Sequence, residues 1–425
     1  MKKIYGRIVI KRNGSISPKD APVTKIDDAT YFLINDVEIP SGDGIVVERD
    51  GIVVDGGNHM LKGSEKGIGV ILKKRSGVTV KNLGIQDFGN AIGLDHSSNN
   101  SIIGNSIVGN DAVGVNLTYS SNNKIAGNSI RSMYGICLWL NSNNNEIVDN
   151  TLENNRCGIM NAYSSSNNMI VKNRFIGCGL DIEKSYGNVV TDNTVNGKPL
   201  VYLEGEYGKT ISKGDIGQVI LVKCFNMTVE NLEISNTTVG IELVETTSSR
   251  IANNTIKNCT NGITLSHSSN NNEIVGNSIV ENSASGFFLL FSSNNRFYYN
   301  NLINNKNQVS LLPIYWKNRW DNGKYGNYWS DYHGYDTNND GIGDLPHPVC
   351  KALYPKHDAL PRSLRMAFYP DPPPVSRFPF FGPSYSHRDE DRHPLMKPYV
   401  TRLELELEAR KKKNPYGKLR IFSLG

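Results

Sequence analysis

The chain has 425 residues, with 40 glycines, 46 lysines and arginines against 41 aspartates and glutamates, and a formal net charge of +5. This length is enough for more than one domain, and no apolar run approaches the ~20 residues of a membrane-spanning helix. From Arg362 onward there are 13 basic and 7 acidic residues, so the excess charge belongs to the end of the chain. The nearly neutral remainder argues against nucleic-acid binding, and the basic end is either a solvated tail or a contact for an acidic partner.

The start of the chain carries charge but no apolar segment. Met1-Lys-Lys-Ile is followed by Tyr5-Gly-Arg, so this sequence shows no export signal. Seven Asn-x-Ser/Thr triplets would make a glycoprotein of an exported chain, although an Asn- and Ser-rich sequence produces such triplets by chance. We expect residues 1–44 to form an N-terminal cap.

A short asparagine-rich motif, Ser98-Asn-Asn-Ser-Ile-Ile-Gly-Asn105, recurs through the middle of the chain. A fixed period of 20–23 residues indicates a solenoid in which each repeat is one coil. Apolar residues alternate within the repeats, as at Ile263 and Leu265, which is the period of a strand. The sequence therefore predicts an all-β fold, a parallel β-helix of roughly a dozen coils over residues 45–312. The recurring asparagine should form a ladder of stacked amides. Its members are Asn105, Asn128, Asn150, Asn173, Asn193, Asn254, Asn277 and Asn300.

The solenoid divides into two similar runs, which open with Thr79-Val-Lys-Asn-Leu and Thr228-Val-Glu-Asn-Leu. The join, residues 196–222, does not fit the period, and we expect either coils with altered turns or one protruding loop. Six cysteines show no C-x-x-C pair. Cys157 and Cys178 should lie in neighbouring coils at one corner, where a buried ladder of small side chains is favoured over a disulfide or a metal pair.

The last coil and the residues after it are rich in aromatic side chains. Residues 285–291 are apolar on both faces of a predicted strand, so both sides need cover. We expect residues 313–349 to fold back as an aromatic cap over the end of the solenoid, with Trp316, Trp320 and Trp329 at its centre. Residues 350–425, a Pro-rich insertion and a basic tail, should be partly disordered.

An oxygen-rich loop follows the aromatic segment. Its spacing is that of the first part of a calcium loop, but His347 stands where the bidentate glutamate would be. A weak calcium site and a polar turn remain open as alternatives. The candidate ligands are Asp336, Asn338, Asp340, Ile342 (through its carbonyl) and Asp344.

The rhythm of Gly-Ile-x-Leu and Ser-Ser-Asn-Asn-x-Ile, together with the segment from Trp320 to Tyr332, resembles the NosD-like family. The resemblance covers about residues 8–349 and resumes at Asp391 to Tyr399. It implies a right-handed parallel β-helix with carbohydrate-binding and sugar-hydrolysis type repeats, located outside the cell, at its surface or in the periplasm. The resemblance also implies a copper-related role in the maturation of a partner protein. The histidines and methionines are scattered, so copper is not supported by the sequence.

Side chains between the inward apolar positions should point outward. Trp139 and Tyr163 then lie on an outward row, where an indole either stacks on a sugar or is buried under a loop. Asp181, Glu183 and Glu242 are the candidate catalytic carboxylates, suited to general acid–base work on a glycosidic bond or a uronate. A solvated face is the alternative for these carboxylates. The substrate-binding candidates are Trp139, Tyr163, Tyr202, Glu204 and Lys223.

Three hypotheses of function follow. The first is a surface or secreted β-helix that binds a polysaccharide or another glycan. The second is a polysaccharide hydrolase, lyase or epimerase. The third is an assembly factor that acts on a partner protein.

Overall fold

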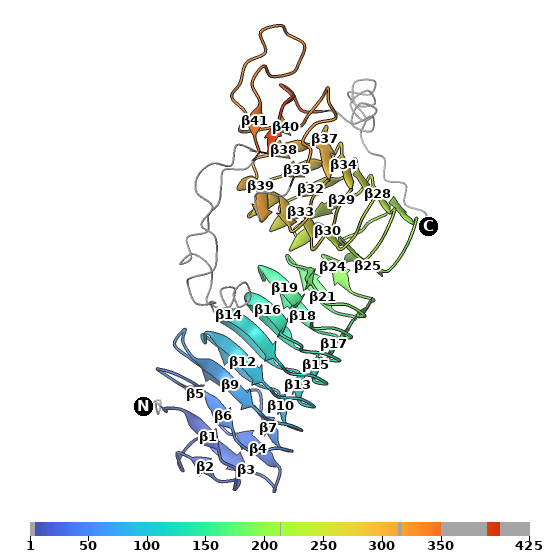
Figure 1. The fold of residues 1–425 in the computed structure, drawn as a ribbon. Coiled ribbons are helices and arrows are strands. Elements are labelled where there is room, and N and C mark those ends of the chain that lie inside the picture. The colour runs from blue at the N-terminus through green and yellow to red at the C-terminus, as the bar shows by residue number, and fades with distance from the viewer. Residues whose placement is uncertain (1–4, 213, 313–316, 350–388, 400–425) are drawn as a thin grey trace, which may run out of the picture.

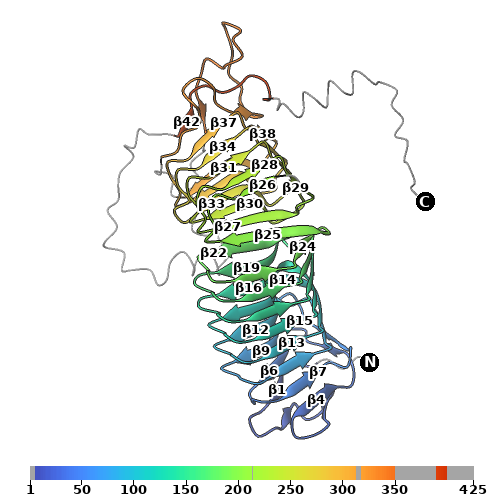
Figure 2. The same ribbon diagram turned by 90° about the vertical axis from the view of Figure 1, so that its right-hand side faces the viewer.

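The chain folds into a rod of stacked coils. The computed structural model describes residues 5–212, 214–312, 317–349 and 389–399. These residues form a β-solenoid of about 13 turns, with no α-helix among them (Figure 1, Figure 2). The all-β, parallel β-helix prediction is confirmed. None of the described segments forms a helix long and apolar enough to cross a membrane.

The first run of coils has three faces. One face holds β3 (Val23–Lys25), β4 (Thr30–Leu33), β7 (Val53–Asp55), β10 (Thr79–Lys81), β13 (Ser101–Ile103), β15 (Lys124–Ala126), β17 (Glu146–Val148), β20 (Met169–Val171) and β23 (Val189–Thr191). The second holds β5 (Val37–Glu38), β8 (Met60–Lys62), β11 (Gly84–Gln86), β18 (Thr151–Glu153), β21 (Arg174–Ile176) and β24 (Thr194–Val195). The third face holds β6 (Ile45–Val47), β9 (Ile68–Lys73), β12 (Asn90–Asp95), β19 (Cys157–Ala162) and β22 (Leu180–Glu183). Two long strands, β14 (Ser106–Thr118) and β16 (Ser129–Trp139), turn the corner between the second face and the third and belong to both.

The second run repeats this plan. Its first face holds β26 (Thr210–Ser212), β28 (Thr228–Glu230), β31 (Arg250–Ala252), β34 (Glu273–Val275) and β37 (Arg296–Tyr298). Its second face holds β29 (Glu233–Ser235), β32 (Thr255–Lys257), β35 (Ser278–Val280), β38 (Asn301–Ile303) and β40 (Tyr328–Trp329). The third face is β25 (Lys198–Glu204), β27 (Gln218–Val222), β30 (Val239–Val244), β33 (Asn261–Ser266), β36 (Ser285–Leu290) and β39 (Asn307–Leu312). At the N-terminus, β1 (Ile8–Ile10) pairs in parallel with β6 and antiparallel with β2 (Ile16–Ser17).

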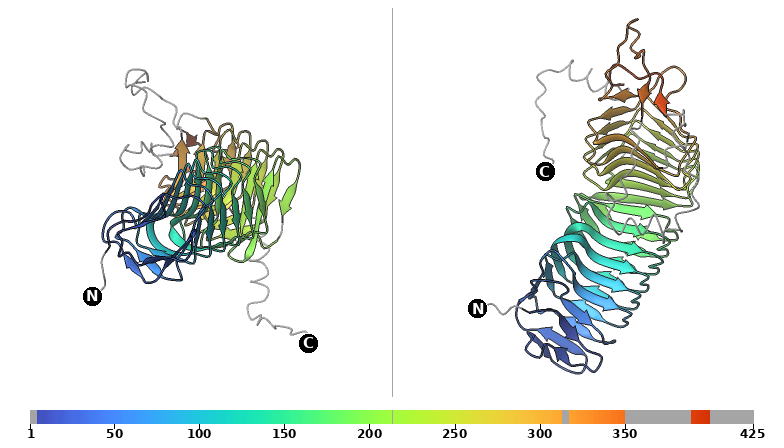
Figure 3. Two further views of the ribbon diagram at one scale, coloured as in Figure 1. Left: turned by 90° about the horizontal axis from the view of Figure 1, so that it is seen from below. Right: turned by 60° about the vertical axis from the view of Figure 1, so that its left-hand side comes forward.

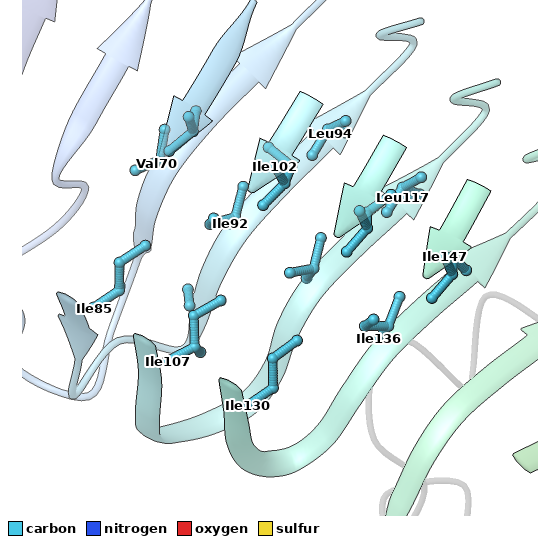
Figure 4. Packing of buried hydrophobic residues seen from close by; sticks show 14 of the residues in the cluster. Val70, Ile85, Ile92, Leu94, Ile102, Ile107, Leu117, Ile130, Ile136 and Ile147 are labelled. Carbon is cyan, nitrogen blue, oxygen red and sulfur yellow. The ribbon is translucent and has the colours of Figure 1, made fainter. Parts of the chain in front are cut away.

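Apolar side chains fill the inside of the rod in rows. Ile85, Ile107 and Ile130 lie above one another in successive coils, each fully buried (Figure 4). Because strand side chains alternate, one apolar residue in two is enough to build this core. The core has two clusters, which correspond to the two runs.

The predicted asparagine ladder is present. Asn128 Nδ2 donates to Asn150 Oδ1 at 2.9 Å and to the Ile102 carbonyl at 2.9 Å, while Asn128 Oδ1 accepts from the Asn105 backbone and side chain. A second ladder, which the sequence analysis did not single out, runs beside it through Asn100, Asn123 and their successors. Each amide satisfies backbone groups at a corner where the chain turns away from strand pairing.

The glycine of Gly-Ile-x-Leu is required by the close approach of successive coils. A Cβ atom at Gly135 would lie 2.3 Å from the carbonyl oxygen of Gly158 in the next coil. No side chain fits at that separation, so the motif marks where the coils are closest.

The two runs meet at a bend. The Asn196-Gly197 turn, with positive φ at both residues, reverses the chain so that β24 and β25 pair antiparallel. The stacking direction then changes between β22 and β25 (Figure 3). The join is therefore a hairpin that restarts the solenoid, which corresponds to altered turns and not to a protruding loop.

The open edge of β22 is capped by side chains of the second run. Gln218 Oε1 accepts from Leu180 N at 3.0 Å, and Gln218 Nε2 donates to the Leu180 carbonyl at 2.6 Å. The nominally outward side chains of Ile220, Val222 and Val244 complete the core of the first run. The side of one run thus closes the end of the other, because exposed strand edges and apolar core ends both need cover.

Aromatic residues close the far end of the core. The Trp320 ring stacks on Phe297 with centroids 4.3 Å apart, and both Trp320 and Trp329 are buried. Asn327 continues the ladder by accepting from Asn300 Nδ2 at 2.8 Å, so the cap is a last partial coil. Trp316 lies outside the described residues.

A segment from beyond the predicted insertion clasps this cap, which the sequence analysis did not predict. Strands β41 (His347–Pro348) and β42 (Glu390–Asp391) pair antiparallel. The buried Asp391 carboxylate accepts from Trp329 Nε1 at 2.8 Å and from Asn327 N at 2.7 Å. The disorder expected for the insertion and the tail stays a prediction, because residues 350–388 and 400–425 lie outside the described residues.

Candidate functional site

The carboxyl residues singled out in the sequence gather at the bend between the runs. Alternation along β22 places Leu180 and Ile182 in the core and turns Asp181 and Glu183 to the opposite side, where both are partly exposed. Glu242 comes from β30 of the second run, and each of its carboxyl oxygens lies 3.4 Å from Ile182 N. The bend thus brings together three groups that lie up to 61 positions apart in the sequence.

The expectation that Glu242 points to solvent is wrong. Its side chain is only 1% exposed, because the face of β30 that would be outward in a straight rod packs on the end of the first run. Cys137, which the same alternation would turn outward on β16, is also buried. Alternation along a strand fixes which side a residue faces, but not whether another part of the chain covers that side.

Burial raises the pKa values of two of these carboxyl groups. The pKa of Glu242 lies well above its ordinary value because of burial and the negative charge of Asp181 beside it. Burial also raises the pKa of Asp181, to about 6, since contact with Glu242 offsets only part of the desolvation. Two adjoining carboxyl groups hold one proton between them more readily than they ionise together.

A histidine from the second run completes the cluster. His267 Nε2 lies 3.4 Å from Glu183 Oε1, and the His267 side chain is almost fully buried. Thr264 sits directly opposite Glu242 in the strand ladder. The Thr264 hydroxyl and His267 Nδ1 have no hydrogen-bond partner in the described part of the chain. Buried polar groups are normally satisfied, so these atoms indicate room for a polar ligand or water.

Trp139 and Tyr163 flank the cluster on the first run. Their rings are stacked, with centroids 5.4 Å apart and an interplanar angle of 15°, and Trp139 is half-buried. One face of the indole is therefore occupied by Tyr163, which leaves a single face for any ligand. Burial and the charge of Glu183 raise the pKa of the Tyr163 hydroxyl, so it remains a donor.

The remaining substrate-binding candidates lie to one side of the cluster. Tyr202 donates to Glu204 Oε2 at 2.6 Å, and the other Glu204 oxygen accepts from Gly187 N at 2.7 Å. Lys223 Nζ lies 3.5 Å from the centroid of the Tyr186 ring. These contacts stabilise the hairpin side of the bend, and no contact joins Glu204 or Lys223 to Asp181.

The predicted calcium loop lies at the C-terminal end of the rod. Asp336 carboxyl oxygens accept from the backbone of Asp340 and Gly341, and Asp344 accepts from Thr337. Asp340 Oδ1 accepts from Ile342 N, and Asn338 Nδ2 donates to Asp340. Across the described ranges, no group of three or more His, Cys, Asp or Glu side chains is arranged to hold a metal ion. Calcium stays a prediction.

His267 is the member of the site that the sequence analysis missed. Its repeat position, shared with His96, indicates a corner residue, and both have positive φ. Nothing local to residue 267 predicts that a bend brings it to Glu183. The signal that could have located the bend is Asn196-Gly197, a dipeptide typical of two-residue hairpins.

The family model described as "Periplasmic copper-binding protein (NosD)" matches residues 12–178 and 176–334. The chain belongs to the NosD family. The expectation about copper stays a prediction for this NosD-family protein: among the described residues, no group of three or more His, Cys, Asp or Glu side chains is arranged to hold a metal ion. The five described cysteines are buried and free, and burial raises the pKa of Cys137 to about 12, which keeps its thiol protonated.

No curated protein matches the chain. Among solved structures, it is similar to a mutant of the periplasmic alginate epimerase AlgG, with 14% identity over 68% of this chain and 67% of that one, at a TM-score of 0.30. It is also similar to the catalytic domain of a GH87 α-1,3-glucanase in complex with nigerose, with 16% identity over 71% and 62%, at a TM-score of 0.31. A tailspike mutant of E. coli bacteriophage HK620 in complex with a pentasaccharide matches at 12% over 66% and 61%, at a TM-score of 0.31. The matches thus span 61–67% of these chains, and similarity at this level bears on no function of this one.

Proposed function

We propose that this NosD-family protein binds a carbohydrate chain at the inner side of the bend, outside the cytoplasm as the family description implies. The observation that carries the proposal is the junction itself, where Asp181, Glu183 and Glu242 meet a buried His267 with an unpartnered ring nitrogen. Sugar hydroxyls both donate and accept hydrogen bonds, and ionised carboxylates are strong acceptors for them. The partly exposed ring of Trp139 supplies an apolar surface beside these polar groups.

A second function, acid–base catalysis on a polysaccharide, is favoured by the adjoining carboxyl groups of Asp181 and Glu242. The pKa of Glu242 is raised well above its ordinary value and that of Asp181 to about 6. Carboxyl groups whose environments separate their protonation states are the usual general acid and general base of glycosidic chemistry. Glu242 also caps the edge of β22 through Ile182, so it stabilises the junction as well. Hydrolase, lyase and epimerase reactions all use such a pair.

The test is binding by calorimetry across a panel of neutral and acidic oligosaccharides. Glu183→Gln keeps the size of the side chain but removes its charge, and it should weaken binding about tenfold, the effect of one charge-assisted hydrogen bond. Trp139→Ala should also weaken binding. Glu153→Gln is the matched control, because Glu153 is an exposed carboxylate on β18 of the same run.

Turnover separates the two functions. Release of products that disappears in Asp181→Asn while binding persists would favour catalysis. If no oligosaccharide binds the unmodified protein, the proposal is refuted, and a role in assembling a partner protein becomes the leading hypothesis.

A further inference from the structure

A polar groove lies at the C-terminal end of the rod, away from the carboxyl cluster. Its volume is about 990 Å³, and its walls come from the corner of the last coils and from the clasp that begins at Asp389. Asparagine side chains, including Asn271, Asn294 and Asn322, line it together with four basic residues. The groove therefore combines amide groups, which suit hydroxyls, with positive charge.

Two of the basic side chains of the groove lie opposite each other, although like charges repel. Arg296 and Arg319 are exposed and stand opposite each other in adjacent coils. Lys317 and Arg392 add two further positive charges to the walls. Like charges directly opposite in a sheet are destabilising, and Glu273, the ladder neighbour of Arg296 on its other side, offsets only part of this repulsion.

The acidic residues of the walls balance these charges in number but not in position. The walls hold four carboxylates and four cations, so their net charge is zero. Glu273 pairs with Arg250, accepts from the Tyr298 hydroxyl and stands opposite Arg296 in the strand ladder, and Asp321 lies 3.5 Å from His393 Nδ1. The local excess of positive charge lies where Arg296 and Arg319 face each other. No ion pair of these cations is found in the described part of the chain.

Two buried polar atoms in the walls have no hydrogen-bond partner in the part of the chain that the structure describes. Trp320 is 1% exposed, and its Nε1, which is a donor only, has no hydrogen-bond partner among the described residues. Asp389 Oδ2 is buried and unpartnered there as well. Burial raises the pKa of the Asp389 carboxyl and the nearby Trp320 indole offsets part of that rise, so this donor and this acceptor face each other and do not by themselves require a ligand.

We infer that this groove binds an acidic saccharide, with a uronate carboxylate between Arg296 and Arg319. Guanidinium groups match carboxylates in geometry and charge, and the asparagines provide hydrogen bonds for the ring hydroxyls. The inference does not depend on the function proposed for the bend, because it rests on different residues.

The experiment is calorimetric titration of the full chain with an oligogalacturonate and with a neutral oligoglucan of equal length. The double variant Arg296→Gln and Arg319→Gln should bind the oligogalacturonate at least tenfold more weakly, with no loss of thermal stability because the repulsion is removed. Arg174→Gln is the matched control, since Arg174 is also an exposed arginine at the first position of a short strand. Binding to the unmodified protein should weaken as salt is raised.

Equal affinity for the neutral oligoglucan, or affinity unchanged in the double variant, would overturn the inference. Inorganic phosphate that competes as well as the oligogalacturonate would also overturn it, and would leave a site for a free oxyanion. Glu183→Gln separates the two sites, because it should change binding at the bend and leave this groove unaffected.

Discussion

Replacing Asn128 by leucine tests whether the amide ladder stabilises the rod. The asparagine side chain is 1% exposed and makes four hydrogen bonds, two as donor and two as acceptor. Leucine has a similar size but no polar atom. The variant would therefore leave the Ile102 carbonyl and the Asn105 backbone N–H buried without the partners they have now.

The magnitude follows mainly from the Asn105 N–H, because the Ile102 carbonyl lies within the β13–β15 ladder, where the backbone of the next coil also donates to it. A buried donor that loses its partner costs about 1–3 kcal/mol, so the variant should lose about that much unfolding free energy. The neighbouring amides lose less, because Asn105 Nδ2 retains the Val80 carbonyl and Asn150 Oδ1 retains Asn128 N. Van der Waals contact of the leucine with the core offsets only part of this loss.

Equilibrium unfolding in urea, followed by circular dichroism, measures the effect. Solenoids unfold in segments, so hydrogen exchange should show lost protection in the coils next to residue 128 before the rest of the rod is affected. Ser129→Ala is the control, since Ser129 is exposed on the same coil and should change stability by less than about 0.5 kcal/mol. If Asn128→Leu behaves like this control, the ladder is not a source of stability.

Three further outcomes are expected. Because burial raises the pKa of Asp181 to about 6, the folded state holds a proton that the unfolded chain releases near pH 4, so stability should fall as pH rises from about 4 to 6. Asp181→Asn should flatten this pH dependence of the melting temperature, and an unchanged slope would contradict the raised pKa. Millimolar calcium should raise the melting temperature, and Asp340→Ala should abolish the rise; no shift in the unmodified protein would leave only a polar turn. Gly135→Ala should destabilise by about 1–3 kcal/mol in urea unfolding because of the approach to Gly158, whereas Gly93→Ala, whose nearest atoms are side-chain methyl groups, should cost less; equal losses would refute the close-approach argument.

The sequence predicts the coil well because everything in a coil is local or periodic. Each strand is short and alternates, and Asn128 finds Asn150 one period away, so the repeat length alone specifies the contact. The family resemblance indicated that a matching segment resumes near Asp391, but it did not predict that this segment clasps the cap. The outward position of Trp139 was predicted by extending the periodicity, and Trp139 is indeed partly exposed.

Periodicity fails at the bend because the contact there breaks the repeat. Glu242 and His267 have ordinary repeat positions, and only the changed stacking direction after Asn196-Gly197 brings them to Asp181 and Glu183. No interval between repeats encodes that direction. The direction of stacking depends on Ile220 and its neighbours, which are apolar on the outward face of their strands. The sequence contains these apolar residues, but the surface that they cover is known only from the structure.

The bend also explains why the carboxyl groups have unusual properties. On a straight solenoid, an outward carboxylate is hydrated and titrates normally. Here the side of one run covers the end of the other, and the edge of β22 presents backbone N–H groups that need polar acceptors. Gln218 and Glu242 meet that need, but Glu242 carries a titratable group into a buried corner beside Asp181. The same requirement that closes the rod therefore creates the pair of carboxyl groups with raised pKa values, and a neutral glutamine at position 242 would satisfy the edge without creating that pair.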